Sequence, residues 1–206
     1  MKIGIDFDNT IAGYDRVFAA LAAERGVASR DAGKRSVRDA LRARGESGEV
    51  EWQRLQAAAY GRRMAEAELI PGVAEFLDAC RGRGVVVHVV SHKTRYANLD
   101  PERVDLRLAA LAWMRRQGVV GDGGLDDGAV HFADTRADKI ACIADLDLTH
   151  FIDDLEEVFA EPSFPTTVEA ILYDPSGALP RPLERSLKLS SFPRWRDITE
   201  HVFAPR

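Results

Sequence analysis

The stretch KIGIDFDNT at residues 2–10 decides how the chain folds. Its first half, KIGID, is a short apolar run of the kind that forms a strand buried on both faces of a sheet. Its second half places Asp6 and Asp8 two residues apart at the carboxyl end of that strand. Because alternate side chains of an extended chain point to the same side, we expect both carboxylates at one edge of the sheet.

Four more short apolar runs follow, and helical patterns lie between them. The runs are VVVHVVS at 85–91, AVHFA at 129–133, THFID at 149–153 and VEAILY at 168–173. Strands that alternate with helices predict an α/β protein with a five-stranded parallel sheet covered on both faces. The ligand site of such a sheet lies beyond the carboxyl ends of its strands.

The helical patterns repeat apolar residues at i, i+3 or i+4, and i+7. They are Val73, Phe76, Leu77 and Cys80; Val104, Leu108 and Leu111; Ile140 and Ile143; and Leu155, Val158 and Phe159.

Residues 14–69 interrupt the alternation, since they contain no strand pattern. They predict three helices, around Val17–Leu21, Val37–Leu41 and Trp52–Met64. We therefore predict a core of residues 1–13 and 70–206 with a helical insertion at 14–69. The proline-rich residues 174–206 are expected to wrap the core as a tail, with a last short helix at 195–203.

Composition narrows the class of protein. The chain has 206 residues, 46% of them hydrophobic and 30% charged, and a net charge of −5. This fits one globular domain with a modest insertion, and the acidic balance disfavours a protein that coats nucleic acid. No apolar run is long enough for a bilayer and no signal-peptide pattern is present. Cys80 and Cys142 form no metal-binding motif, so we expect a reducing, cytoplasmic setting.

A second acidic pair, Asp153-Asp154, ends the fourth apolar run. Up to four carboxylates could thus converge at one edge of the sheet, where two charges 4 Å apart repel by about 4 kcal/mol at an effective dielectric of 20. Such a cluster requires a cation, and oxygen ligands with room for water and phosphate suit Mg²⁺ better than Ca²⁺. The alternative is that these aspartates only cap helices, which is common at strand ends. Their joint placement at two strand ends favours the metal site.

Two residues extend this pattern. Ser91 ends the second apolar run, where its hydroxyl could hold a phosphate oxygen or simply stabilise a turn. Lys139 lies in the first turn of a predicted helix, where the helix dipole disfavours a cation. That placement indicates an anionic partner elsewhere in the fold, although an exposed lysine without a role is an equally simple explanation.

Together these residues resemble the haloacid dehalogenase superfamily of phosphoryl-transfer enzymes. The resemblance rests on DFDNT at 6–10, Ser91, Lys139 and Asp153-Asp154, and it covers residues 1 to about 173. It implies a Rossmann-like core with strand order 5-4-1-2-3 and a cap inserted after the first motif, where the helical segment 14–69 lies. It also implies an aspartyl-phosphate intermediate on Asp6.

The resemblance assigns further roles. Mg²⁺ would be held by Asp6, the backbone carbonyl of Asp8, Asp153 and the phosphate. Asp154 would bind the metal through water, orient Lys139 or only cap a helix. Asp8 would be the general acid and base, which favours phosphate esters over dehalogenation. Lys139 and Ser91 would hold the phosphoryl oxygens.

Other predicted site residues surround this set. Lys93 could supply the phosphate-binding cation instead of Lys139. We prefer Lys139 because a lysine that opens a helix fourteen residues before the acidic pair matches the arrangement of the family that the chain resembles. His92 could touch the leaving group. By resemblance, Thr10 would brace the turn after the nucleophile, where Asn9 tolerates unusual backbone conformations.

In the insertion, Arg38 and Arg62 are candidate contacts for a second anionic group of the substrate. The simpler interpretation is that both side chains are only solvated. We thus predict a Mg²⁺-dependent phosphatase of small metabolites, sugar phosphates or nucleotides. A phosphomutase and a non-catalytic phosphometabolite-binding protein are the alternatives, and net charge disfavours a nucleic-acid end-processing enzyme.

Overall fold

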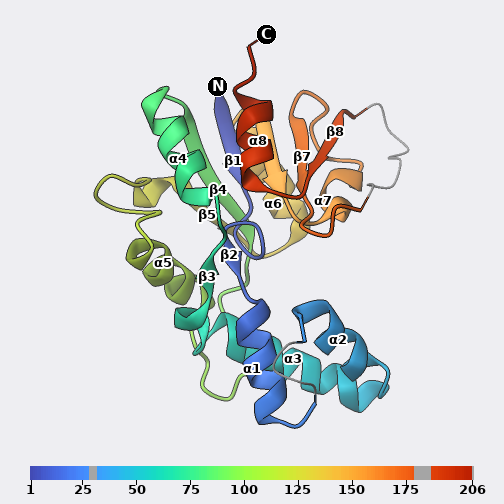
Figure 1. Cartoon of the computed structure of the whole chain (residues 1–206). Coiled ribbons are helices and arrows are strands. Elements are labelled where there is room, and N and C mark those ends of the chain that lie inside the picture. Colours follow the sequence, from blue (N-terminus) through green and yellow to red (C-terminus); the bar gives the residue numbers. More distant parts are fainter. Residues whose placement is uncertain (28–31, 179–186, 206) are drawn as a thin grey trace. The chain divides into compact units, whose positions relative to one another are not determined.

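The computed structural model describes residues 1–27, 32–178 and 187–205 (Figure 1). Contacts divide the chain into two units. The core unit comprises Met1–Ile11, Leu69–Lys93 and Gly118–Arg206, and the helical unit comprises Ala12–Glu68 and Thr94–Gln117. Residues 94–117, which the predicted boundaries assigned to the core, thus group with the helices. Pro180 and Pro182 of the predicted tail lie outside the described residues.

The core unit is built on a parallel sheet. Its described strands are β1 (Lys2–Ile5), β4 (Val86–His92), β5 (Val130–Ala133), β6 (His150–Asp153), β7 (Glu169–Tyr173) and β8 (Leu189–Phe192), in the order β5-β4-β1-β6-β7-β8. When β1, β4, β5, β6 and β7 are numbered 1 to 5 in chain order, they lie in the order 3-2-1-4-5. This is the predicted order 5-4-1-2-3 read from the other edge of the sheet, so the prediction is confirmed. The predicted number of strands was wrong, because β8 adds a sixth strand beside β7.

Pairing around β1 fixes what lies at the carboxyl edge of the sheet. Ile5 pairs with Val89 on one side and with Ile152 on the other. The backbone N–H of Asp6 donates to the Ile152 carbonyl at 2.8 Å, which extends the ladder by one residue. The residues that follow β1, β4 and β6 therefore emerge side by side.

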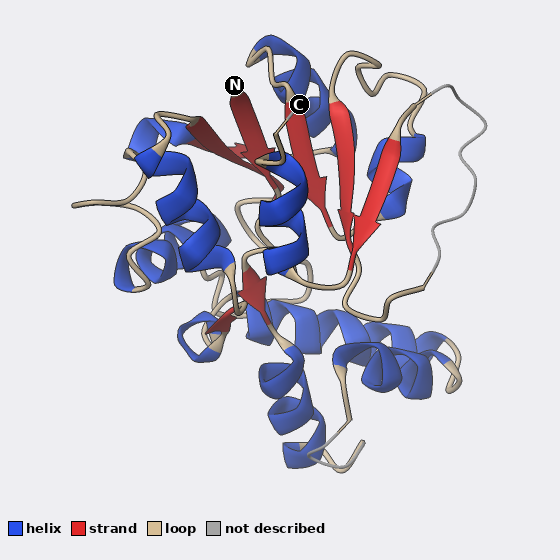
Figure 2. Cartoon of the chain, turned by 45° about the horizontal axis from the view of Figure 1, so that its top comes forward, coloured by secondary structure: helices blue, strands red, loops and turns tan. Residues whose placement is uncertain are grey.

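Helices cover both faces of this sheet (Figures 1 and 2). One face carries α4 (Val73–Gly82) and α8 (Trp195–Val202), and the other carries α6 (Arg136–Asp145) and α7 (Glu156–Ala160). A short 3₁₀ turn, η2 (Asp127–Ala129), precedes β5. On the face that α6 and α7 cover, Phe151 of β6 packs with Phe159 of α7 and with Phe164 in a buried aromatic cluster. The apolar strand pattern therefore reflects burial on both faces.

Local sequence explains why α6 begins where it does. The hydroxyl of Thr135 accepts a hydrogen bond from the backbone N–H of Asp138 at 3.1 Å, as an N-cap does. The helix then buries Lys139, Ile140 and Ile143 toward the sheet. A lysine in the first turn is thereby directed inward, toward the carboxyl edge of the strands.

The helical unit contains α1 (Asp15–Glu24), α2 (Lys34–Arg42), α3 (Glu46–Tyr60), the 3₁₀ turn η1 (Met64–Glu66) and α5 (Leu106–Arg116). Helices form at the three predicted places in residues 14–69, but the third begins earlier and ends earlier than predicted, at Glu46 and Tyr60. The expectation of no strand there was wrong, because β3 (Glu68–Leu69) lies at its end. Phe18 of α1 stacks on Trp52 of α3, with ring centroids 5.0 Å apart. Two short strands, β2 (Ala12–Gly13) and β3 (Glu68–Leu69), pair where the chain passes from one unit to the other.

The register predicted for α5 was wrong. Val104 precedes the helix, and the side chain of Leu108 is 63% exposed. Asp105 caps the helix by accepting hydrogen bonds from the N–H groups of Arg107 and Leu108. Because this cap sets where the helix starts, the buried face consists of Leu106, Ala110, Trp113 and Met114.

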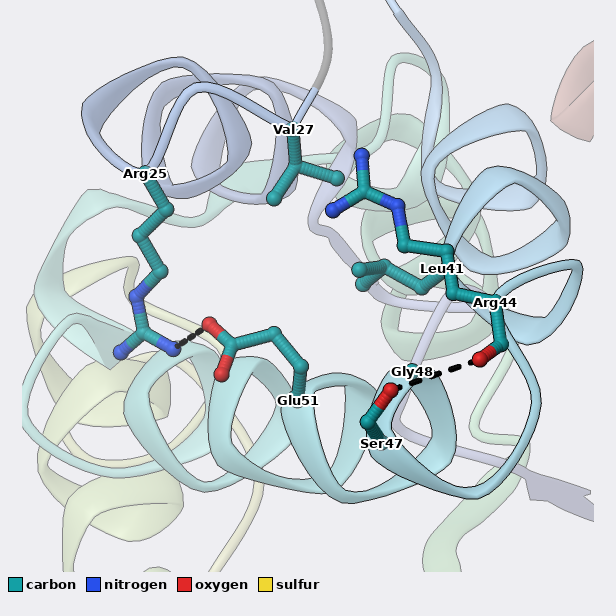
Figure 3. A pocket seen from close by; sticks show the side chains of 7 residues that line it. All are labelled: Arg25, Val27, Leu41, Arg44, Ser47, Gly48 and Glu51. Atoms are coloured by element: carbon teal, nitrogen blue, oxygen red, sulfur yellow. Dashed lines mark hydrogen bonds and ion pairs between the residues drawn. The ribbon is translucent and has the colours of Figure 1, made fainter.

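A pocket of about 280 Å³ opens among the helices of the helical unit (Figure 3). Its lining residues are Arg25, Val27, Leu41, Arg44, Ser47, Gly48 and Glu51. Arg25 and Glu51 form an ion pair within it, and the Ser47 hydroxyl donates to the Arg44 carbonyl at 3.3 Å. None of the site residues predicted from the sequence lines this pocket. Among the described residues, no helix combines the length and the apolar character that crossing a membrane requires.

Candidate active site

The predicted acidic residues meet at the carboxyl edge of the core sheet. Asp6 follows β1 directly, and Asp153 is the last residue of β6, the neighbouring strand. Both carboxylates are buried, with 6% and 0% of the residue exposed. Each carboxylate lies here because strands that run parallel end at the same edge, as the sequence predicted.

Lys139 bridges these two carboxylates. Its Nζ donates to Oδ1 of Asp6 and to Oδ2 of Asp153, each at 2.6 Å, and the lysine is only 2% exposed. Burial alone would lower the pKa of Lys139, but the two carboxylates raise it above its ordinary value. The side chain is therefore a buried ammonium ion held between two acids from different strands.

The pKa of Asp6 is also shifted from its ordinary value. Burial raises the pKa of Asp6 to about 7, and the nearby carboxylates of Asp153 and Asp8 add to this rise while Lys139 opposes it. The Asp6 carboxylate thus depends on a nearby cation to remain ionised. Perturbed carboxyl groups of this kind gather at catalytic sites more often than elsewhere in a protein.

Three carboxylates lie close enough together that they could hold one metal ion. Among the described residues, oxygen atoms of Asp6, Asp153 and Asp154 all lie within 4.8 Å of one another. An all-oxygen set that is mostly buried fits a hard divalent cation such as Mg²⁺. Asp153 also accepts a hydrogen bond from the Leu155 N–H through Oδ1 at 2.9 Å, so it stabilises the turn before α7 as well.

Ser91 and Thr10 each bury a hydroxyl in the core unit. Ser91 belongs to β4 and is 1% exposed, and Thr10 is fully buried. Within the described part of the chain, neither Oγ of Ser91 nor Oγ1 of Thr10 has a hydrogen-bond partner. A buried hydroxyl without a partner costs about 1–3 kcal/mol, so the Ser91 hydroxyl at the edge of the sheet suits a ligand oxygen.

Thr10, in the turn after β1, makes a hydrogen bond through its backbone: its carbonyl accepts from the indole N–H of Trp195 at 3.0 Å. Its predicted role of bracing this turn remains a prediction. Asn9 does adopt the left-handed conformation, with φ of +62°, as the sequence predicted for this turn.

Lys93 pairs with Asp8 rather than with Asp6. Its Nζ lies 2.8 Å from Oδ2 and 3.1 Å from Oδ1 of Asp8, and the lysine is 4% exposed. The backbone N–H of Lys93 donates to the Ala133 carbonyl of β5, which anchors the residue. The two candidate lysines therefore serve different acids. Sequence reasoning missed this pairing, for which the sequence offers one signal, a lysine just past a strand end.

The remaining predicted residues lie elsewhere. His92 is exposed, and its Nε2 lies 3.1 Å from the Asp134 carbonyl. Arg38 and Arg62 belong to the helical unit, where they form exposed ion pairs with Asp39 and Glu102. These three assignments to the substrate remain predictions.

Substitution of Asp153 tests whether these carboxylates bind a metal ion. We expect Asp153→Asn to weaken Mg²⁺ binding at least about 10-fold, because the amide lacks the charge that a hard cation requires. Isothermal titration calorimetry with Mg²⁺ measures the change. Asp145→Asn, an exposed aspartate of α6, serves as the control. Equal Mg²⁺ affinity in the two variants contradicts the assignment.

Comparison with solved structures shows which proteins share this fold. A search of protein-family models found no match, and neither did a search of curated proteins. Among solved structures, a HAD-superfamily hydrolase from Ehrlichia chaffeensis aligns over 98% of this chain and 95% of its own, with 12% identity and a TM-score of 0.55.

Two further structures carry different names. A dehalogenase with an intermediate complex aligns over 100% of this chain and 97% of its own, with 14% identity and a TM-score of 0.61. A candidate phosphoglycolate phosphatase from Lactobacillus delbrueckii subsp. bulgaricus aligns over 99% and 98%, with 16% identity and a TM-score of 0.57. The chain thus has the fold of the HAD-superfamily hydrolases, and that fold hosts more than one chemistry.

Proposed function

We propose that this protein is a Mg²⁺-dependent hydrolase of small phosphate monoesters, such as sugar phosphates or nucleotides. One observation carries the proposal: Lys139 holds Asp6 and Asp153 at 2.6 Å in a buried cluster that includes Asp154. This cluster offers a nucleophile, a cation and a set of hard oxygen ligands at one sheet edge, which are the parts that phosphoryl transfer requires.

The reaction has two steps. In the first, an Asp6 carboxylate oxygen attacks phosphorus, the bond from phosphorus to the ester oxygen breaks, and Asp8 gives its proton to the leaving oxygen. In the second, Asp8 takes a proton from water as the water oxygen attacks phosphorus. The bond between phosphorus and Asp6 then breaks, which releases inorganic phosphate and restores both aspartates.

Other groups balance charge during these steps. Lys139 keeps Asp6 ionised before attack and can donate to a phosphoryl oxygen as charge shifts toward the ester. The buried Ser91 hydroxyl, which has no partner among the described residues, is suited to a second phosphoryl oxygen. Bound Mg²⁺ would be held by Asp6, Asp153 and Asp154 and would supply positive charge against the phosphate anion.

Asp8 supports phosphate ester hydrolysis over dehalogenation. A halide leaves without a proton, whereas an alkoxide needs one, so a second acid beside the nucleophile favours the ester. Lys93 contacts both oxygens of the Asp8 carboxylate, which limits the freedom of that side chain.

The acid role of Asp8 predicts a dependence on the leaving group. We expect Asp8→Asn to reduce kcat/KM at least about 10²-fold for an alkyl phosphate. The same variant should lose only a few-fold with p-nitrophenyl phosphate, because p-nitrophenolate leaves with little protonation. Steady-state kinetics with both substrates measure the two losses. Equal losses contradict the acid role.

The proposal as a whole is tested by phosphate release. We expect the wild-type chain to release inorganic phosphate from at least one member of a panel of sugar phosphates, nucleotides and other small phosphate esters. Release should require Mg²⁺ and stop with EDTA. Stoichiometric binding of a phosphate ester without release would instead indicate a binding protein, and interconversion of isomers without release would indicate a mutase.

A further inference from the structure

The only tryptophan of the core unit contacts the turn that carries the predicted nucleophile. Trp195 is fully buried, and its indole N–H donates to the Thr10 carbonyl at 3.0 Å. The two residues lie 185 positions apart in the sequence. The other tryptophans, Trp52 and Trp113, belong to the helical unit.

Packing fixes the Trp195 ring in place. The ring lies against Phe76 of α4 and Tyr173 of β7, with centroid distances of 5.0 Å and 6.0 Å. Gly72, with φ of +93°, leaves room for it, because a Cβ at that position would lie 2.7 Å from the Cβ of Trp195. The indole N–H is therefore aimed at Thr10 by surroundings that allow it little freedom.

Backbone hydrogen bonds beside Thr10 also shape this turn. The N–H of Ile11 donates to the Phe7 carbonyl at 3.0 Å, and the Ile11 carbonyl accepts from the N–H of Ile70 at 2.9 Å. Asn9 adopts a left-handed backbone conformation, which non-glycine residues rarely populate without support. Thr10, which accepts the hydrogen bond from Trp195, lies between Asn9 and Ile11 in the sequence.

We propose that Trp195 is a positioning residue for catalysis, and this inference rests on the proposed function. Its hydrogen bond to Thr10 holds the turn of residues 6–11, so that Asp6 faces phosphorus and Asp8 faces the leaving oxygen. The C-terminal segment thereby takes part in catalysis without touching the substrate. A small displacement of reacting groups is enough to slow an enzyme about 10²-fold.

Trp113 offers a matched control. It is also fully buried, and its indole N–H also donates to a backbone carbonyl, that of Ala67, at 2.9 Å. We expect Trp195→Phe to lower kcat about 10- to 100-fold with KM changed less than about 2-fold. Trp113→Phe removes an equivalent bond from the helical unit, so it should change stability comparably and kcat far less. An equal fall of kcat in both variants, or none in either, overturns the inference.

Hydrogen exchange provides a readout that needs no turnover. Peptides covering residues 6–11, followed by mass spectrometry, should exchange faster in Trp195→Phe and at the wild-type rate in Trp113→Phe. Unchanged exchange in Trp195→Phe overturns the inference even if the wild-type chain releases phosphate. Faster exchange upholds the structural part even if no phosphate is released, which would be a failure of the proposed function alone.

A second variant covers the case in which phenylalanine leaves too large a gap for folding. β-(3-Benzothienyl)alanine at position 195 keeps the ring size and replaces the N–H with sulfur, which cannot donate. We expect the same fall of kcat and the same faster exchange. Wild-type values for both overturn the inference.

Discussion

Asp6→Asn is expected to abolish turnover, with kcat reduced by about 10⁴-fold or more. An amide cannot form the bond to phosphorus that the Asp6 carboxylate forms, so the first step has no nucleophile. The fold should persist, because Lys139 keeps its 2.6 Å contact with Asp153 and the substitution removes one of several crowded negative charges. Phosphate release under saturating substrate measures kcat, and circular dichroism checks folding.

Asp147→Asn is the control for this experiment. Asp147 is an exposed aspartate of the core unit with φ of +52°, a conformation that asparagine also tolerates. It should retain wild-type activity. If Asp6→Asn retains activity within a few-fold of the wild-type chain, another residue is the nucleophile.

Lys139→Met should produce the second largest loss, a fall in kcat/KM of about 10²- to 10³-fold. The variant removes the cation that keeps Asp6 ionised and that meets the phosphoryl oxygens. It also leaves two buried carboxylates without their shared ammonium, and breaking a buried ion pair costs about 3–5 kcal/mol of folding free energy. Urea unfolding measures this cost, and initial rates at low substrate measure kcat/KM.

Lys93→Met is the matched comparison, since Lys93 is the other buried lysine at this edge of the sheet. Because Lys93 contacts Asp8 and leaves the Asp6–Lys139–Asp153 contacts intact, we expect a smaller loss of kcat/KM. A loss equal to or greater than that of Lys139→Met would assign the phosphate-binding role to Lys93.

Much of the core sheet could be predicted from local sequence. KIGID and the four later apolar runs correspond to β1, β4, β5, β6 and β7, because strands buried on both faces are apolar along their whole length. The strand order came from the family resemblance. The convergence of Asp6 and Asp153 followed from a general property of parallel sheets, and the structure brings their carboxylates to one lysine.

Other elements carry no such local signal. The strand β8 has the sequence LSSF, which is too short and polar to stand out, and it forms because β7 offers an open edge. The start of α5 depends on the cap at Asp105, which overrides the apolar spacing of Val104 and Leu108.

Within the site, long-range contacts were the least predictable. The partner of Asp8 is Lys93, 85 positions away, and the partner of the Thr10 carbonyl is Trp195. Such pairs depend on tertiary packing, so neither residue's immediate sequence indicates them. The hydroxyls of Ser91 and Thr10 were assigned as polar contacts from sequence, but their burial without a partner among the described residues emerges only from the fold.

Turnover in water enriched in ¹⁸O tests the central claim most directly, since it reports which atom water attacks. If Asp6 carries a phosphoryl group, water attacks phosphorus, so each released phosphate gains one ¹⁸O and the peptide that contains Asp6 stays unlabelled. Mass spectrometry of phosphate and of the digested protein measures both. Label in the Asp6 carboxylate, which arises when water attacks the carboxyl carbon of an alkyl ester intermediate, would contradict the account.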